Sequence, residues 1–229
     1  MSNQLLKIGH RGVKAHVAEN TIASVKKALE FGVDAIEIDV HKCASGELVV
    51  FHDFTLDRMT NGSGEVNKHT LTQLKKLKVE NKYRIPTLEE VLNVIDRQCI
   101  LNIELKGSET AMPTCKTISE YIETKYWNLN HFLISSFQHQ ELKTVYNINP
   151  QLRLGVLTKA SVSDAIAYAK TIDAHAIHPN VALLSKDNVT LAQNKGYKVI
   201  TWTVNNQQTI ERVKGYGVDG IISDNPELI

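Results

Sequence analysis

The sequence predicts an α/β fold, specifically a (β/α)8 TIM barrel with a small insertion between barrel strands 2 and 3. Short apolar runs rich in β-branched residues alternate with segments of helical spacing, which is typical of βαβ units and a parallel sheet. Eight such units fit a chain of 229 residues, since barrels of this type usually have about 250 residues. A doubly wound open sheet is the alternative. It normally carries a glycine-rich phosphate loop after its first strand, where this chain has Gly9-His10-Arg11-Gly12 instead.

Each element follows from its local pattern. Strands are expected in eight apolar runs, at residues 5–10, 34–40, 100–106, 131–137, 152–157, 174–179, 198–204 and 219–223. Helical spacing predicts helices at 21–31, 87–95, 112–124, 138–146, 161–170, 185–195 and 206–215. Gly32, Gly196 and Gly217 follow three of these segments, where a helix end needs a positive φ.

The interval 47–84 breaks the alternation. It has a short strand at 48–51, two glycines at Gly62 and Gly64, and a small amphipathic helix near 71–77. We expect it to form a lobe over one barrel mouth. The chain is therefore predicted to be a single domain, 1–229, with an inserted lobe at about 47–84.

Composition narrows the class of protein. Hydrophobic residues make up 42% and charged residues 22%, as in ordinary globular proteins. The formal charge of +1 gives no global field to attract nucleic acid or an anionic membrane. The amino terminus lacks a secretory signal, and no run of about 18 apolar residues predicts a membrane span. Three widely spaced cysteines, Cys43, Cys99 and Cys115, are best explained as reduced thiols. A cytoplasmic protein without nucleic-acid or membrane partners is expected.

Carboxylates gather on two predicted strands. Barrel active sites lie at the carboxyl ends of the strands, so charged residues there are candidates for function. Glu37 and Asp39 are two residues apart and share one strand face, and Glu104 shares a face with Lys106 on the next barrel strand. Three carboxylates without cysteine suit Mg²⁺ or Ca²⁺ better than zinc. The spacing leaves an alternative open, in which these carboxylates form salt bridges with Lys106 or Arg11 inside the barrel.

Two histidines follow strand ends beside charged residues. His10 precedes Arg11, and His52 precedes Asp53. Histidine titrates near neutrality, so a pair can take a proton from a nucleophile and give one to a leaving group. Arg11 offers the donor fork that a phosphate oxygen fits. This combination indicates phosphodiester cleavage.

Other polar and aromatic residues carry weaker expectations. His178 ends a predicted strand and could reach the barrel mouth. Trp202 is equally compatible with the core and with the wall of a substrate pocket. The remaining histidines are expected to be solvated, in loops or on helix faces: His16, His41, His69, His131, His139 and His175.

Seven motifs follow one another along the chain: His10-Arg11-Gly12 with Glu19-Asn20-Thr21, Glu37-Ile38-Asp39-Val40, His52-Asp53-Phe54-Thr55-Leu56-Asp57-Arg58 with Gly62 and Gly64, Ile85-Pro86-Thr87-Leu88-Glu89-Glu90-Val91, Asn102-Ile103-Glu104-Leu105-Lys106, Trp202-Thr203-Val204-Asn205, and Asp219-Gly220-Ile221-Ile222-Ser223-Asp224-Asn225-Pro226. Together they resemble the glycerophosphodiester phosphodiesterase family over essentially the whole chain. The insertion after the second barrel strand is also a family feature. Departures are small: Ala18 stands where a proline is usual, and Met59 where a threonine is usual.

The resemblance implies metal-dependent hydrolysis of a small glycerophosphodiester to sn-glycerol 3-phosphate and an alcohol. It also implies one divalent cation, Mg²⁺ or Ca²⁺. By motif, the expected roles are catalysis by His10 and His52, substrate binding by Arg11, Lys106 and Trp202, and metal binding by Glu37, Asp39 and Glu104.

Two alternative functions are also compatible with this fold. A lysophospholipase D-type lipid phosphodiesterase should show an apolar rim or a membrane-binding segment, and the 6% aromatic content argues against it. A catalytically silent phosphodiester-binding member would have no need of the complete set of two histidines, one arginine and three carboxylates.

Overall fold

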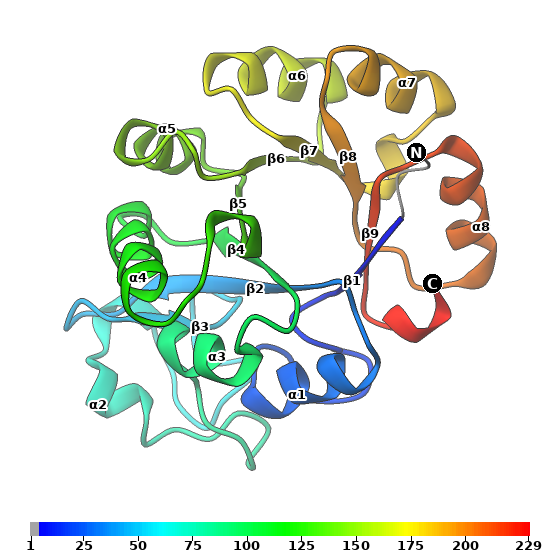
Figure 1. Cartoon of the computed structure of the whole chain (residues 1–229). Helices are drawn as coiled ribbons and strands as arrows, with labels where there is room; N and C mark the ends of the chain where they lie inside the picture. Colours follow the sequence, from blue (N-terminus) through cyan, green and yellow to red (C-terminus); the bar gives the residue numbers. More distant parts are fainter. Residues whose placement is uncertain (1–4) are drawn as a thin grey trace.

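The computed structural model describes residues 5–229, and there it confirms the predicted (β/α)8 barrel, seen roughly end-on in Figure 1. Neighbouring barrel strands are parallel, and β1 pairs with both β2 and β9, which closes the ring. The barrel strands are β1 Leu6–Gly9, β2 Ala35–Lys42, β4 Ile100–Leu105, β5 Phe132–Ser136, β6 Leu154–Thr158, β7 Ala176–Pro179, β8 Lys198–Thr201 and β9 Gly220–Ser223. The absence of a secretory signal was inferred from residues 1–7, of which 1–4 lie outside the described residues.

Helices surround the strands (Figure 1), and each predicted helix is present. They are α1 Ile22–Glu30, α3 Leu88–Ile95, α4 Ala111–Thr124, α5 His139–Ile148, α6 Val162–Thr171, α7 Lys186–Asn194 and α8 Gln207–Tyr216. The first helix begins after Thr21 because this residue is the N-cap, with extended backbone and a side chain that accepts from Ser24 N. Gly217 ends α8 at φ 78°, as its position predicted. Short 3₁₀ turns lie at Leu129–His131, Val181–Leu183 and Pro226–Leu228.

Strand alternation separates the core from the site. On β2, Ile36, Ile38 and Val40 are fully buried in the large apolar cluster beneath the helices. Successive strand side chains point to opposite faces, so Glu37 and Asp39 point into the barrel. The predicted division of this strand into an apolar outer face and an acidic inner face is therefore confirmed.

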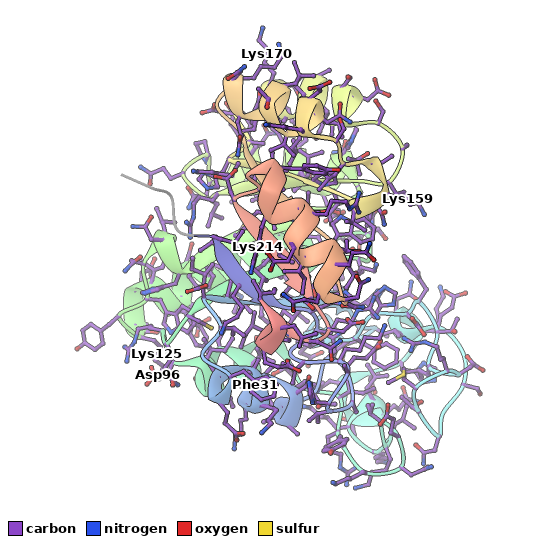
Figure 2. The ribbon with its side chains drawn as sticks, turned by 90° about the vertical axis from the view of Figure 1, so that its right-hand side faces the viewer. Phe31, Asp96, Lys125, Lys159, Lys170 and Lys214 are labelled. Atoms are coloured by element: carbon purple, nitrogen blue, oxygen red, sulfur yellow. The ribbon has the colours of Figure 1, made fainter. Side chains whose placement is uncertain are left out.

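The inserted segment packs on its own apolar cluster. Strand β3 Leu48–Val50 pairs antiparallel with the end of β2, and a 3₁₀ turn Val66–Lys68 and helix α2 Leu71–Leu74 follow. Phe51 and Leu56 belong to this separate buried cluster. In the side view of Figure 2, the segment lies at the same end as Lys159, which directly follows β6, whereas Asp96 and Lys125 lie at the opposite end. The segment is thus at the carboxyl ends of the strands; the single domain 1–229 stays a prediction.

One expected solvated residue is buried. His41 lies on β2, which runs to Lys42 because β3 pairs with it, and the side chain is 3% exposed. Its Nε2 lies 3.2 Å from the carbonyl oxygen of His52. The prediction of a solvated His41 was wrong, since the strand was expected to end at residue 40. Within residues 5–229, no helix has the length and apolarity needed to cross a membrane.

Candidate active site

A cavity of about 410 Å³ opens at the carboxyl ends of the strands. This volume is within the usual range of small-molecule sites, about 300 to 1,000 Å³. Asp39 is the one predicted site residue that does not line the cavity; it is 1% exposed. The predicted residues that line it are His10, Arg11, Glu37, His52, Glu104, Lys106 and Trp202.

The three predicted metal carboxylates meet. Glu37 and Asp39 come from β2, and Glu104 is the register neighbour of Asp39 on the adjacent β4. Each offers an oxygen atom, and these atoms lie within 4.8 Å of one another. Parallel pairing of β2 with β4 in this register is what brings carboxylates about 65 residues apart together.

Local cations neutralise only part of this cluster. Lys106 Nζ lies 3.0 Å from Glu104 and 3.8 Å from Asp39, and Arg11 Nε lies 3.3 Å from Asp39. The ion pairs of the alternative interpretation are therefore present. However, the buried Oε1 of Glu37 has no hydrogen-bond partner among the described residues.

Burial and neighbouring carboxylates raise the pKa values of two residues in this cluster, Glu37 and Glu104. Burial, followed by repulsion from Asp39 and Glu104, raises the pKa of Glu37 well above its usual value. Burial and Asp39 raise the pKa of Glu104 to about 7, although Lys106 opposes the shift. An additional cation at this position would relieve the repulsion, and an oxygen-only donor set suits a hard divalent ion. The residues present thus fit a metal site.

His10 is oriented by a carboxylate from the other end of the chain. Its Nδ1 lies 2.5 Å from Asp224 Oδ1, and its Nε2 lies 4.0 Å from Glu37 Oε2. Asn205 Nδ2 donates to the second oxygen of Asp224 at 2.8 Å. A carboxylate at Nδ1 favours the tautomer with the proton there, so Nε2 faces the cluster. Burial lowers the pKa of His10, and the hydrogen bond to Asp224 opposes this shift.

His52 has a similar arrangement. Its Nδ1 lies 2.6 Å from Asp53 Oδ1, and the ammonium group of Lys106 lies 3.1 Å from its Nε2. Arg58 Nε donates to the other oxygen of Asp53 at 2.5 Å and, with burial opposing it, lowers the pKa of Asp53 to about 2. Burial lowers the pKa of His52. A carboxylate at Nδ1 and an ammonium at Nε2 both fit a neutral ring protonated at Nδ1.

The turn after β1 requires glycine. A Cβ atom on Gly9 would lie 2.2 Å from the carbonyl oxygen of Gly12, so no other residue fits at position 9 without a shift of the backbone. Gly12 itself has φ 85°, and Arg11 has φ 51°. The Arg11 N–H donates to Glu37 Oε2 at 2.9 Å. This turn therefore fixes His10 and Arg11 against the carboxylate cluster.

The loop before α1 forms hydrogen bonds to Asp39 of the carboxylate cluster and to Arg11. Asn20 donates from Nδ2 to Asp39 Oδ2 at 2.8 Å. Glu19 Oε1 accepts from Arg11 Nη1 at 2.7 Å and from Arg58 Nη2 at 2.6 Å. Sequence reasoning left the roles of Glu19 and Asn20 open; the structure gives both direct contacts to site residues.

Sequence reasoning missed Asp224. The residue follows the predicted strand 219–223, so the strand-end argument that selected His10 and His52 also applied to it. Eight further residues line the same cavity without having been assigned to it: Asn102, Ser135, Phe137, Leu157, Lys159, Asn180, Thr203 and Ile222.

Trp202 lines the active-site cavity and also contacts neighbouring barrel residues. It is partly buried, its Nε1 donates to the carbonyl oxygen of His178 at 2.7 Å, and its ring meets Phe137 edge-on at 5.5 Å between centroids. The sequence allowed His178 to reach the mouth of the barrel, but its side chain is fully buried inside the barrel. Its ring occupies the space that a side chain at Gly155 would fill.

Comparisons with known proteins agree on one family. Residues 10–228 match the model of the glycerophosphoryl diester phosphodiesterase family. A glycerophosphodiester phosphodiesterase of Caldanaerobacter subterraneus subsp. tengcongensis is 38% identical over 98% of this chain and 96% of that protein. One from Bacillus altitudinis is 34% identical over 95% and 94%. An Oleispira antarctica phosphodiesterase, solved with the product sn-glycerol-3-phosphate, superposes with a TM-score of 0.88 at 30% identity, covering 96% of this chain and 93% of its own.

Proposed function

Because this chain belongs to the glycerophosphoryl diester phosphodiesterase family, we propose that it catalyses metal-dependent hydrolysis. His10 and His52 would act as the acid and the base. Membership makes the chain a phosphodiester hydrolase acting on glycerophosphodiesters. The products would be sn-glycerol 3-phosphate and an alcohol. The observation that carries the proposal is the cavity itself, where two histidine–aspartate pairs border a carboxylate cluster with excess negative charge.

Glu37, Asp39 and Glu104 would hold one divalent cation, Mg²⁺ or Ca²⁺. When bound, the cation supplies Lewis-acid polarisation of a phosphate oxygen and offsets negative charge. The unpartnered Oε1 of Glu37 and the pKa of Glu104, raised by burial and by Asp39, support this assignment, because a bound cation would stabilise both carboxylates.

Arg11 and Lys106 would bind the phosphate oxygens. Arg11 Nη1 donates to Glu19, and Asp39 forms an ion pair with the same guanidinium, so the group is positioned before substrate arrives. Lys106 lies between Glu104 and His52, at 3.0 and 3.1 Å. A phosphate there would receive donors from two sides, which stabilises charge that develops in the transition state.

The two histidines would move the protons. With Nδ1 held by Asp224 or Asp53, each ring uses Nε2: a neutral ring accepts a proton from the attacking oxygen, and the other ring, which must first take up a proton at Nε2 to become an imidazolium, donates that proton to the leaving alcohol oxygen. The attacking oxygen is water or the substrate hydroxyl adjacent to the ester, and proximity favours the hydroxyl. A substrate lacking that hydroxyl separates these routes, since only the hydroxyl route yields a cyclic glycerol phosphate. Trp202 and Phe137 would form the apolar wall beside the glycerol.

The central experiment compares His10→Ala and His52→Ala with His131→Ala, a histidine at the opposite end of the barrel. Glycerophosphocholine hydrolysis should fall by at least about 10² in each of the first two and stay unchanged in the third. Undiminished turnover in both site variants would refute the acid–base assignment.

Two further measurements complete the test. Chelator treatment should abolish activity, and titration with Mg²⁺ or Ca²⁺ should restore it and identify the ion. Faster hydrolysis of lysophosphatidylcholine than of glycerophosphocholine would instead favour the lipid phosphodiesterase.

A further inference from the structure

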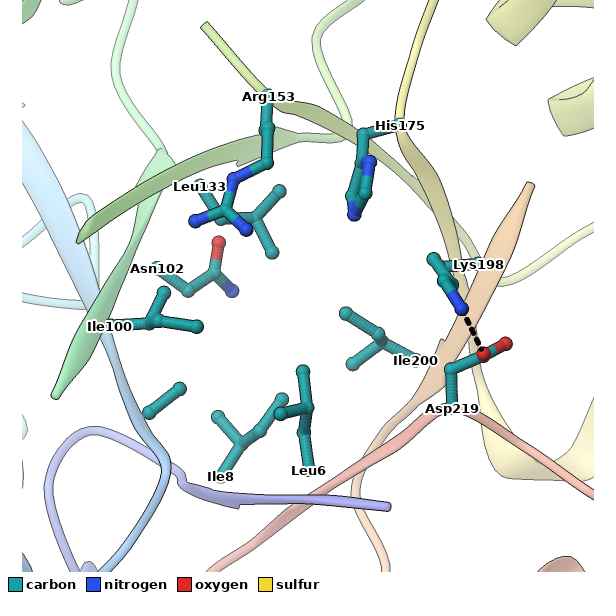
Figure 3. A pocket seen from close by; sticks show the side chains of 11 residues that line it. Leu6, Ile8, Ile100, Asn102, Leu133, Arg153, His175, Lys198, Ile200 and Asp219 are labelled. Atoms are coloured by element: carbon teal, nitrogen blue, oxygen red, sulfur yellow. Dashed lines mark hydrogen bonds and ion pairs between the residues drawn. The ribbon is translucent and has the colours of Figure 1, made fainter. Parts of the chain in front are cut away.

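A second cavity lies at the other mouth of the barrel. It has a volume of about 170 Å³ and is formed at the beginnings of the strands, where Leu6, Ile100 and Lys198 open β1, β4 and β8 (Figure 3). Its walls are mainly apolar, and Ala35 contributes only a methyl group. Barrel active sites lie at the carboxyl ends of the strands, so this amino-terminal cavity is distinct from the phosphodiesterase site. Asn102 is the one described residue that lines both cavities.

Basic residues predominate at the rim of this cavity. Arg153, His175 and Lys198 line it, and Asp219 is the single acidic residue that does so. Lys198 Nζ lies 2.9 Å from Asp219 Oδ1, drawn as the dashed line in Figure 3. Asp219 can balance only one of the cations, so the mouth favours an anion.

Arg153 is the cation without a carboxylate. Its Nε donates to the carbonyl oxygen of Phe132 at 3.1 Å, and its Nη2 donates to that of Asn130. Within residues 5–229 it forms no salt bridge. Burial lowers its pKa, with no acid opposing the shift. A guanidinium held by two carbonyl groups, with donors left over, is preorganised to bind a carboxylate or phosphate.

Asn102 adds an unpartnered amide. The side chain is 1% exposed, and neither Oδ1 nor Nδ2 has a hydrogen-bond partner among the described residues. Figure 3 shows its amide group pointing toward the middle of the barrel, between this cavity and the active-site cavity, which Asn102 also lines. Leaving a buried amide unpaired costs free energy that a ligand with hydrogen-bonding oxygens would recover.

We propose that the amino-terminal cavity binds a small organic carboxylate with an apolar body of about the size of a benzene ring. An apolar cavity of about 150 Å³ in another protein accepts benzene, so a ring fits the apolar walls here. The carboxylate would pair with Arg153, and Asn102 would donate to one of its oxygens. Inorganic phosphate alone would leave the apolar walls uncovered. The proposal is independent of the chemistry at the other mouth.

Benzoate and benzamide are matched probes, because they share a shape and differ in charge. Calorimetric titration of the full chain should show saturable benzoate binding, at least about tenfold tighter than that of benzamide, since a charged hydrogen bond is the stronger. Arg153→Met should abolish this preference. Lys116→Met, which removes an exposed cation from α4, should leave it unchanged.

A second variant tests the location. Ala35→Leu should fill the cavity and abolish binding of both probes, with thermal unfolding confirming that the chain is folded. Because this variant keeps Arg153, the test stands even if Arg153→Met fails to fold. No saturable benzoate binding, equal affinity for the two probes, or undiminished binding in Ala35→Leu would overturn the proposal.

Discussion

Replacing Glu104 by glutamine should stabilise the metal-free protein, although it removes a residue that contacts Lys106 at 3.0 Å. Burial and Asp39 raise the pKa of Glu104 from 4.5 to about 7, and this net shift already includes the attraction of Lys106. A folded-state pKa above the unfolded value means that this group's stabilising contribution is complete below pH 4.5. It is lost as the pH rises through 7.

The magnitude follows from that shift. Between pH 4.5 and pH 8, ionisation of Glu104 should cost the metal-free protein about 3 kcal/mol of unfolding free energy. The side chain is 12% exposed, so solvent screens little of this cost. Glutamine resembles the protonated carboxyl and avoids the penalty. Glu104→Gln should therefore be more stable than the unmodified chain at pH 8 in EDTA, by about that amount.

Urea unfolding at pH 8 in EDTA measures this difference, with Glu120→Gln as a control at an exposed position of α4. Adding Mg²⁺ or Ca²⁺ should then stabilise the unmodified chain more than Glu104→Gln, because an ion that binds only the folded state raises its stability. Phosphodiesterase activity should be lost in the variant. A less stable Glu104→Gln in EDTA would refute the reasoning: the carboxylate would then be a net stabilising partner of Lys106, as the salt-bridge alternative holds.

Three further predictions concern other buried groups. Burial lowers the pKa of His178 to about 3. Below pH 6.5 this side chain therefore binds a proton in the unfolded chain, whereas in the folded chain it stays neutral down to about pH 3. Between pH 7.5 and 5, His178→Leu should thus lose about 2 kcal/mol less unfolding free energy than the unmodified chain; equal losses in urea titrations would contradict this. Burial raises the pKa of Cys99 to about 12 and of Cys115 to about 11, so neither should react with DTNB at pH 8 until urea unfolds the chain. Asp224→Asn should lower kcat by about 10² and move the pH profile to lower pH, because Asp224 raises the pKa of His10; an unchanged profile would deny it a positioning role.

The fold was predictable because its signals are local. Alternating apolar runs and helical spacing predicted all eight barrel strands and seven helices. The start of α3 is an example of a local signal, because Thr87 forms a capping box with a residue only three positions later. Strand ends were less accurate, because they depend on pairing. The strand expected at 198–204 ends at Thr201, where its register with β9 ends, and β2 runs past residue 40 because β3 pairs with it.

The site was partly predictable for the same reason. Glu37 and Asp39 share a face by strand alternation alone, and the positions of His10 and His52 at strand ends beside charged residues indicated these two histidines. Contacts between distant segments gave no such signal. Asp224 is 214 residues from His10, and nothing in the local sequence of either shows that β9 pairs with β1.

Closure of the ring through β1 and β9 has a consequence for the newly made protein. His10 leaves the ribosome 214 residues before Asp224 does. Until β9 emerges, β1 lacks one of its two neighbours, and His10 lacks the carboxylate that orients it. A nascent chain held on the ribosome before residue 224 has emerged should therefore be inactive even when most of its helices have formed, and activity should begin only after Asp224 has emerged.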